Sequence, residues 1–91
     1  MIARRLIVRG RVQGVGYRWW TVETARAAGL AGWVRNRPDG TVEIHAEGKA
    51  AALDTFADAC GGGPPSARVD AVDVAEATVA GGEGFAQRAT G

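Results

Sequence analysis

The chain has 91 residues, of which 46% are hydrophobic and 23% are charged, and its formal net charge at pH 7 is +1. A chain of this length makes one domain, residues 1–91, and its hydrophobic fraction excludes a disordered tail. The near-neutral charge excludes a bulk field that would draw the whole molecule to nucleic acid or a membrane, and a single cysteine, Cys60, excludes an intramolecular disulfide.

The same counts set expectations about cofactors and cellular setting. One cysteine and one histidine are too few ligands for a zinc site, so we expect no metal and no cofactor. No stretch is long enough to span a membrane, and Arg4 and Arg5 are not followed by the apolar run of a signal peptide. We therefore expect a cytoplasmic protein with no membrane partner. We also expect a monomer with no obligate nucleic-acid partner.

Hydrophobic periodicity divides the chain into strands and helices. In the first strand Leu6 and Val8 alternate with Arg5 and Arg9, and glycines and prolines separate the later segments. In chain order the sequence predicts a strand over 5–12, a helix from Tyr17 or Arg18 to Gly29, a strand over 30–37, a turn at Pro38-Asp39-Gly40, a strand over 41–47, a helix over 49–60, a strand over 68–77 and a poorer strand over 85–89.

This order of elements predicts an α+β fold, a ferredoxin-like β-α-β-β-α-β sandwich with an extra C-terminal edge strand. Its antiparallel sheet would carry two helices on one face and leave the other face open. Helical spacing in the first helix predicts an inner stripe of Tyr17, Trp20 with Thr21, Ala25 and Ala28.

Aromatic and polar residues outside the motifs are expected to have structural roles. We expect Trp20 and Trp33 to pack beneath the motifs and Trp19 to be partly exposed. His45 shares a strand face with two glutamates, which indicates a solvated sheet position, and Cys60 closes a helix stripe, which indicates a core position.

The stretch from Gly10 to Arg18 runs from a strand through a glycine-rich turn into a helix. Backbone N–H groups in such a turn converge on an anion, the helix start adds unpaired donors, and an arginine there can grip a phosphoryl group with two parallel N–H bonds. Glycine turns before helices are also common and a single arginine after them is usually solvated, so this motif alone leaves both interpretations open. Arg5, Arg9 and Arg11 would either attract anions or solvate a strand face.

Two segments together resemble the paired signature of the acylphosphatase family. They are Gly-Arg-Val-Gln-Gly-Val-Gly-Tyr-Arg at 10–18 and Gly-Trp-Val-Arg-Asn at 32–36, the second followed by Pro-Asp-Gly-Thr-Val-Glu at 38–43. A looser third segment, Gly-Pro-Pro-x-Ala-Arg-Val at 63–69, is also similar, so the resemblance extends over about residues 4–75.

The resemblance implies hydrolysis of small acyl phosphates to a carboxylate and inorganic phosphate without a metal. It also implies that Arg18 and Asn36 are the catalytic residues, with Arg18 on the phosphoryl group and Asn36 on the attacking water. The phosphate-binding residues it implies are Gln13, Gly14, Val15, Gly16, Tyr17 and Arg18. An amide orients water but takes no proton at neutral pH, so the chemistry has to work without a general base.

Departures from the family pattern fall at Ala28, where a larger aliphatic residue is usual, at Arg37, which adds charge beside Asn36, and at Gln87, where the closing strand is normally apolar. Two alternatives stay open: a nucleic-acid-binding module, although the predicted central strands lack the aromatic pair that such sheets display, and an anion-binding module without turnover.

Overall fold

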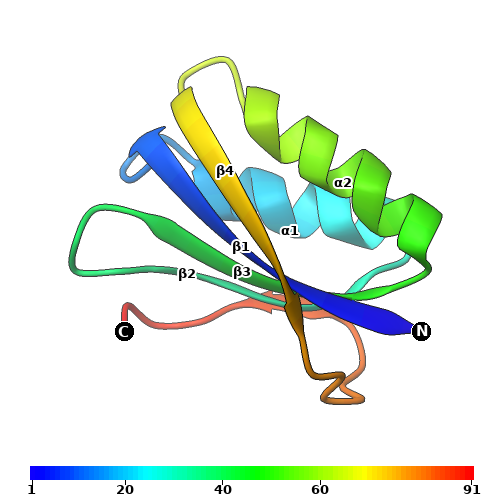
Figure 1. Ribbon diagram of the computed structural model, residues 1–91. Helices are drawn as coiled ribbons and strands as arrows, with labels where there is room; N and C mark the ends of the chain where they lie inside the picture. Colours follow the sequence, from blue (N-terminus) through cyan, green and yellow to red (C-terminus); the bar gives the residue numbers. More distant parts are fainter.

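The computed structural model describes residues 1–91, which form a five-stranded sheet covered on one face by two helices (Figure 1). The spatial order of the strands is β4-β1-β3-β2-β5. The elements are β1 (Ile2–Arg11), α1 (Tyr17–Ala27), β2 (Ala31–Asn36), β3 (Val42–Gly48), α2 (Ala50–Gly62), β4 (Arg68–Ala77) and β5 (Phe85–Gln87). The predicted ferredoxin-like α+β fold is confirmed.

The sheet is mixed because its last strand runs parallel to its neighbour. β1 pairs antiparallel with β3 and with β4, and β2 pairs antiparallel with β3. β5 pairs parallel with β2, with Val34 opposite Gln87. The extra edge strand is therefore present, but it is shorter than the expected 85–89. Figure 1 shows the C-terminal segment continuing beside β2 toward the β2–β3 turn.

The hydrophobic core lies between the helices and the sheet. Leu6, Val8 and Ile44 point from the sheet toward the helices, where they meet Leu53 and Phe56 of α2. Cys60 is fully buried there, as expected, and burial raises the pKa of its thiol to about 12, so it is not a reactive nucleophile.

The inner face of α1 differs from the prediction at two positions. Tyr17, Thr21 and Ala25 are buried as expected, and Val22 joins them. Ala28 is exposed, because the helix ends at Ala27 and the chain turns at the next residues before it can present Ala28 to the core. No helix is long and apolar enough to cross a membrane.

The face of the sheet away from the helices is covered by its own long side chains. Glu43 lies between Arg5 and Arg35, each donating a hydrogen bond of 2.7 Å, and only 7% of its side chain is exposed. Burial alone would raise the pKa of Glu43, but the two guanidinium groups outweigh that effect and lower it.

Two expectations about this face are wrong. His45 is not solvated: its ring stacks on Trp33 and its Nε2 lies 2.5 Å from the Glu47 carboxylate. Trp33 does not pack beneath the motifs, because its position in β2 turns it to this outer face, where the guanidinium groups of Arg35 and Arg88 lie over the indole. These stacked rings and guanidinium groups, and not solvent, cover this part of the outer face of the sheet.

Candidate active site

A glycine-rich loop connects β1 to the first turn of α1. Gly14 and Gly16 have φ angles of +72° and +80°, and Gly16 is the N-cap of the helix. Side chains are strained in this left-handed region, so glycine is required to turn the chain here. The first helical hydrogen bond joins Trp20 N–H to the Gly16 carbonyl at 3.0 Å. The N–H groups of the preceding residues therefore have no partner inside the helix.

Arg18 lies in the first turn of α1, next to these free N–H groups. Its side chain is half-buried and has no carboxylate partner, whereas Arg5, Arg9 and Arg35 all form ion pairs. A half-buried guanidinium without a counter-charge, at the positive end of a helix, is suited to receive an anion. The segment 13–18, predicted from the sequence to bind phosphate, thus brings the unpaired guanidinium of Arg18 together with the N-terminus of α1.

Asn36 is the last residue of β2 and faces the same cavity. Its Oδ1 is buried and has no hydrogen-bond partner within the protein. An unpaired buried acceptor costs free energy of about 1–3 kcal/mol, and such atoms are rare in folded proteins. The unpaired oxygen is therefore an unusual feature of the cavity wall, and it leaves Asn36 with an acceptor that no protein group uses.

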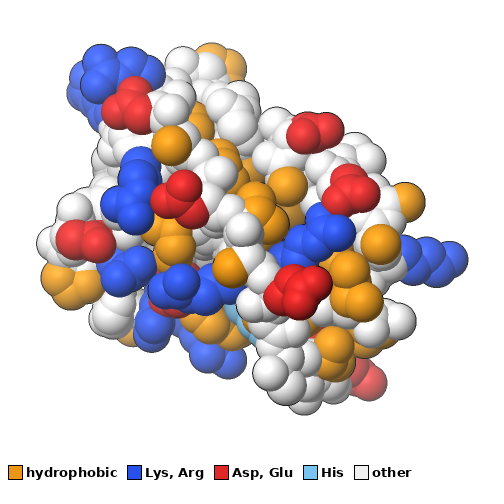
Figure 2. All heavy atoms as spheres, viewed as in Figure 1, with side chains coloured by type: hydrophobic (Ala, Val, Ile, Leu, Met, Phe, Trp, Pro, Cys, Tyr) orange, Lys and Arg blue, Asp and Glu red, His pale blue; other side chains and the backbone are white.

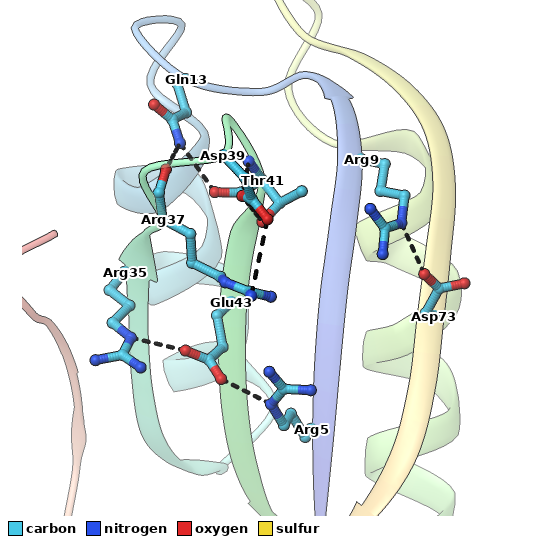
Figure 3. Close-up of polar contacts among 9 residues, drawn as sticks. All are labelled: Arg5, Arg9, Gln13, Arg35, Arg37, Asp39, Thr41, Glu43 and Asp73. Atoms are coloured by element: carbon cyan, nitrogen blue, oxygen red, sulfur yellow. Dashed lines mark hydrogen bonds and ion pairs between the residues drawn. The ribbon is translucent and has the colours of Figure 1, made fainter. Parts of the chain in front are cut away.

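Gln13 has a different place from the one its motif suggests. Its side-chain Nε2 donates to the main-chain carbonyls of Arg37 and Thr41, both at 2.9 Å, as Figure 3 shows. In the turn between those residues, Asp39 accepts bonds from the Thr41 N–H at 3.0 Å and hydroxyl at 2.6 Å, which lower the pKa of Asp39. Gln13 therefore fixes the loop against the β2–β3 turn.

Two further contacts fix the loop from its other side. The Ser66 hydroxyl donates to the Val15 carbonyl at 2.7 Å, and the Tyr17 hydroxyl donates to the Cys60 carbonyl at 2.7 Å. Both come from the region where α2 ends and β4 begins. Burial raises the pKa of Tyr17, so its hydroxyl stays protonated and is committed to this structural bond.

A cavity of about 220 Å³ joins the loop to the end of β2. The structure brings most of the sequence-predicted site residues to its wall; Gln13 and Val15 are absent from it. Its lining also includes three residues that sequence reasoning did not assign to the site, Val12, Trp19 and Gln87. The lining residues are Val12, Gly14, Gly16, Tyr17, Arg18, Trp19, Asn36 and Gln87.

The electrostatics of the cavity are those of an anion site. No aspartate, glutamate or histidine lines it, and no group of three or more metal-ligating side chains is found in the structure. Asp39 is exposed in the turn, while Glu43 and His45 lie on the opposite face of the sheet. Figure 2 shows basic side chains gathered at the end of the molecule that holds the β2–β3 turn and the C-terminus.

Comparisons with known proteins find relatives along nearly the whole chain. A family model described as acylphosphatase matches residues 4–87. An acylphosphatase of Rhodospirillum rubrum is 55% identical over 87 residues, which cover 93% of this chain and 96% of that protein. The crystal structure of acylphosphatase from Bacillus subtilis is 44% identical, covers 97% of this chain and 99% of that one, and has a TM-score of 0.94. Full-length HypF, solved in a phosphate- and nucleotide-bound form, is 30% identical, with a TM-score of 0.90, over 98% of this chain and 12% of its own.

Proposed function

The chain belongs to the acylphosphatase family, and from this premise we propose how its residues hydrolyse an acyl phosphate, with Arg18 and the loop binding the phosphoryl group and Asn36 orienting water. The activity is acylphosphatase activity, the cleavage of a small acyl phosphate into a carboxylate and inorganic phosphate. The observation that carries the residue assignment is the orphaned Asn36 Oδ1 in a cavity shared with the unpaired Arg18.

The phosphoryl group occupies the loop end of the cavity. Phosphoryl transfer spreads negative charge over the equatorial oxygens, so positioning and charge stabilisation supply most of the catalysis. The free N–H groups after Gly16 and the guanidinium of Arg18 receive those oxygens. These donors are held in place before substrate arrives, because the Gln13 and Ser66 hydrogen bonds fix the loop on both sides.

Water attacks from the side of Asn36. Its Oδ1 accepts a hydrogen bond from the water, and its Nδ2 is a donor, so one amide sets the direction of the attacking lone pair. The water oxygen bonds to phosphorus while the bond from phosphorus to the acyl oxygen breaks. The acyl group leaves as a carboxylate, which needs no acid, and the proton of the water passes to a phosphate oxygen.

Phosphate release from acetyl phosphate in excess chelator tests this assignment. Removing one preorganised donor to a transition-state charge typically costs about 10²–10³ in rate, and we expect that loss in Arg18→Ala and in Asn36→Ala. Arg11→Ala is the matched control, because Arg11 is also without an ion-pair partner but does not line the cavity. Near-normal turnover of both variants with correct folding would refute the assignment.

The same reasoning extends to metals and to the setting of the enzyme. We infer that turnover needs no metal, that the chain works as a monomer in the cytoplasm and that residues 1–91 act as one domain. Support for the first inference comes from a mechanism whose charge stabilisation uses Arg18 and main-chain donors alone. A rate that falls with chelator and returns with magnesium would contradict the first inference, and a dimer in sedimentation experiments would contradict the second.

A further inference from the structure

We propose that Trp19 and Gln87 form the acyl end of the active site, where Trp19 stacks on a planar acyl group and Gln87 donates a hydrogen bond to the leaving carboxylate. This inference rests on the proposed function, because it assumes that the phosphoryl group lies at Arg18. Trp19 and Gln87 line the same cavity as Arg18 and Asn36, and the phosphoryl chemistry uses neither of them.

The register of the C-terminal strand places Gln87 on the side of the sheet that bears Asn36. Gln87 lies opposite Val34 in the parallel β2–β5 pair, and paired residues point to the same face. Val34 is fully buried beneath the helices, and Asn36 follows it by two residues on that face. The main-chain bond from Gly91 N–H to the Asn36 carbonyl, 3.2 Å, continues this alignment past the strand.

A glutamine is unexpected at this position. Phe85, two residues earlier on the same face, is buried in the core, so continuation of the pattern would put a second apolar residue at 87. Gln87 is instead exposed and lines the cavity. The side-chain amide of Gln87 donates a hydrogen bond without giving up its proton. Cleavage of an acyl phosphate leaves a new negative charge on the carboxylate, next to the bond that breaks. The geometry therefore provides a stabilising donor for the leaving group.

Trp19 supplies a flat apolar surface at the rim. Its neighbours Tyr17 and Trp20 turn inward, with ring centroids 5.4 Å apart, whereas Trp19 is 64% exposed. The cavity volume of about 220 Å³ is below the roughly 300–1,000 Å³ of sites that enclose larger ligands. A cavity of this size takes the phosphoryl and carbonyl groups, and an aromatic acyl group extends beyond it onto the indole.

The test of Trp19 is the ratio of kcat/KM for benzoyl phosphate to that for acetyl phosphate. Aromatic stacking of about 0.5–1.5 kcal/mol corresponds to about a 2- to 12-fold change, so Trp19→Ala lowers this ratio within that range. Trp19→Phe keeps the ratio within about twofold, because a ring remains. Val74→Ala, which trims an exposed apolar side chain on β4, is the control and leaves the ratio unchanged. An unchanged ratio in Trp19→Ala overturns the role of Trp19.

The test of Gln87 uses a series of substituted benzoyl phosphates. Without the amide donor more leaving-group charge is uncompensated, so Gln87→Leu makes log kcat fall more steeply with the pKa of the departing acid. A merely structural role would lower all substrates equally, and that parallel result, or no change, overturns the role of Gln87. Arg18→Ala distinguishes failure of this inference from failure of the proposed function. If Arg18→Ala keeps turnover, the proposed function fails. If Arg18→Ala loses turnover while the benzoyl-to-acetyl ratio in Trp19→Ala and the slope in Gln87→Leu stay unchanged, only this inference fails.

Discussion

The side chain of Gln13 donates a 2.9 Å hydrogen bond to the main-chain carbonyl of Arg37 and so connects the two halves of the proposed active site. Gln13 belongs to the glycine-rich loop, and Arg37 directly follows Asn36 at the end of β2. A second bond of the same length, to the Thr41 carbonyl, completes the attachment to the β2–β3 turn (Figure 3). One amide group therefore connects the two ends of the proposed site directly.

Gln13→Ala is expected to loosen this connection. Two part-buried carbonyls lose their side-chain donor, and each bond contributes about 0.5–1.5 kcal/mol, so the free energy of unfolding falls by about 1–3 kcal/mol. We also expect kcat to fall about tenfold, since donor and water are less well aligned. Urea unfolding and steady-state kinetics measure the two effects. Wild-type kcat in a folded Gln13→Ala variant would show that the loop is positioned by other contacts.

Gly16→Ala is expected to impair both stability and turnover. A φ of +80° strains alanine by about 1–2 kcal/mol, although the added methyl would meet no atom within 4 Å. Relief of the strain rotates the peptide groups at the helix start, so kcat/KM falls. Gly29→Ala is the matched control, with φ of +71° and equally open surroundings at the far end of α1. It should lose similar stability in thermal unfolding but keep kcat/KM, and equal kinetic loss in both variants would contradict the prediction.

Local patterns predicted most of the fold because each segment carries its own signal. Alternation in β1, the Pro38-Asp39-Gly40 turn and the glycines and prolines after α2 are all short-range features, and the predicted order of strands and helices is found in the structure. The parallel pairing of β5 with β2 was not predictable in this way. It depends on where a chain end meets the sheet, which is a long-range property.

The motifs predicted where Arg18 and Asn36 lie, but not which other residues join them. Gln13 belongs to the phosphate motif, yet its amide bonds to the β2–β3 turn. Gln87 is 51 residues from Asn36 in the sequence, and only the β5 register brings it to the cavity. The prediction that His45 is solvated was wrong for the same reason. A strand pattern does not reveal that Trp33 and side chains distant in the sequence cover the outer face.

The rate of hydrolysis is expected to depend only weakly on pH between about 5 and 8. No carboxylate or imidazole lines the cavity, and the raised pKa of Tyr17 keeps its hydroxyl protonated throughout that range. A positioned base near neutrality would instead produce a bell-shaped profile. Initial rates of acetyl phosphate hydrolysis across this range measure the effect. A sharp bell would reveal a base that acts from outside the described cavity, with Asp39, Glu43 and His45 as the residues to substitute.

Acid should destabilise the fold in part through Glu43. Its pKa in the folded state is lowered from 4.5, because the bonds from Arg5 and Arg35 outweigh the opposing effect of burial. The carboxylate therefore contributes its full stability above about pH 4.5 and loses it as the pH falls through the lowered value. Glu43→Gln removes this contribution, and we expect it to lower the free energy of unfolding by about 1–2 kcal/mol at pH 7.

The difference between wild type and Glu43→Gln should shrink as the pH falls below 4.5, since protonated wild-type Glu43 resembles glutamine. Urea unfolding at pH 7, 5 and 3 measures this convergence. Asp73→Asn is the control, because the Arg9–Asp73 pair is more than half exposed at both side chains and should matter by less than about 0.5 kcal/mol at each pH. A constant difference between wild type and Glu43→Gln at all three pH values would mean that the glutamine variant perturbs packing and not the charge network.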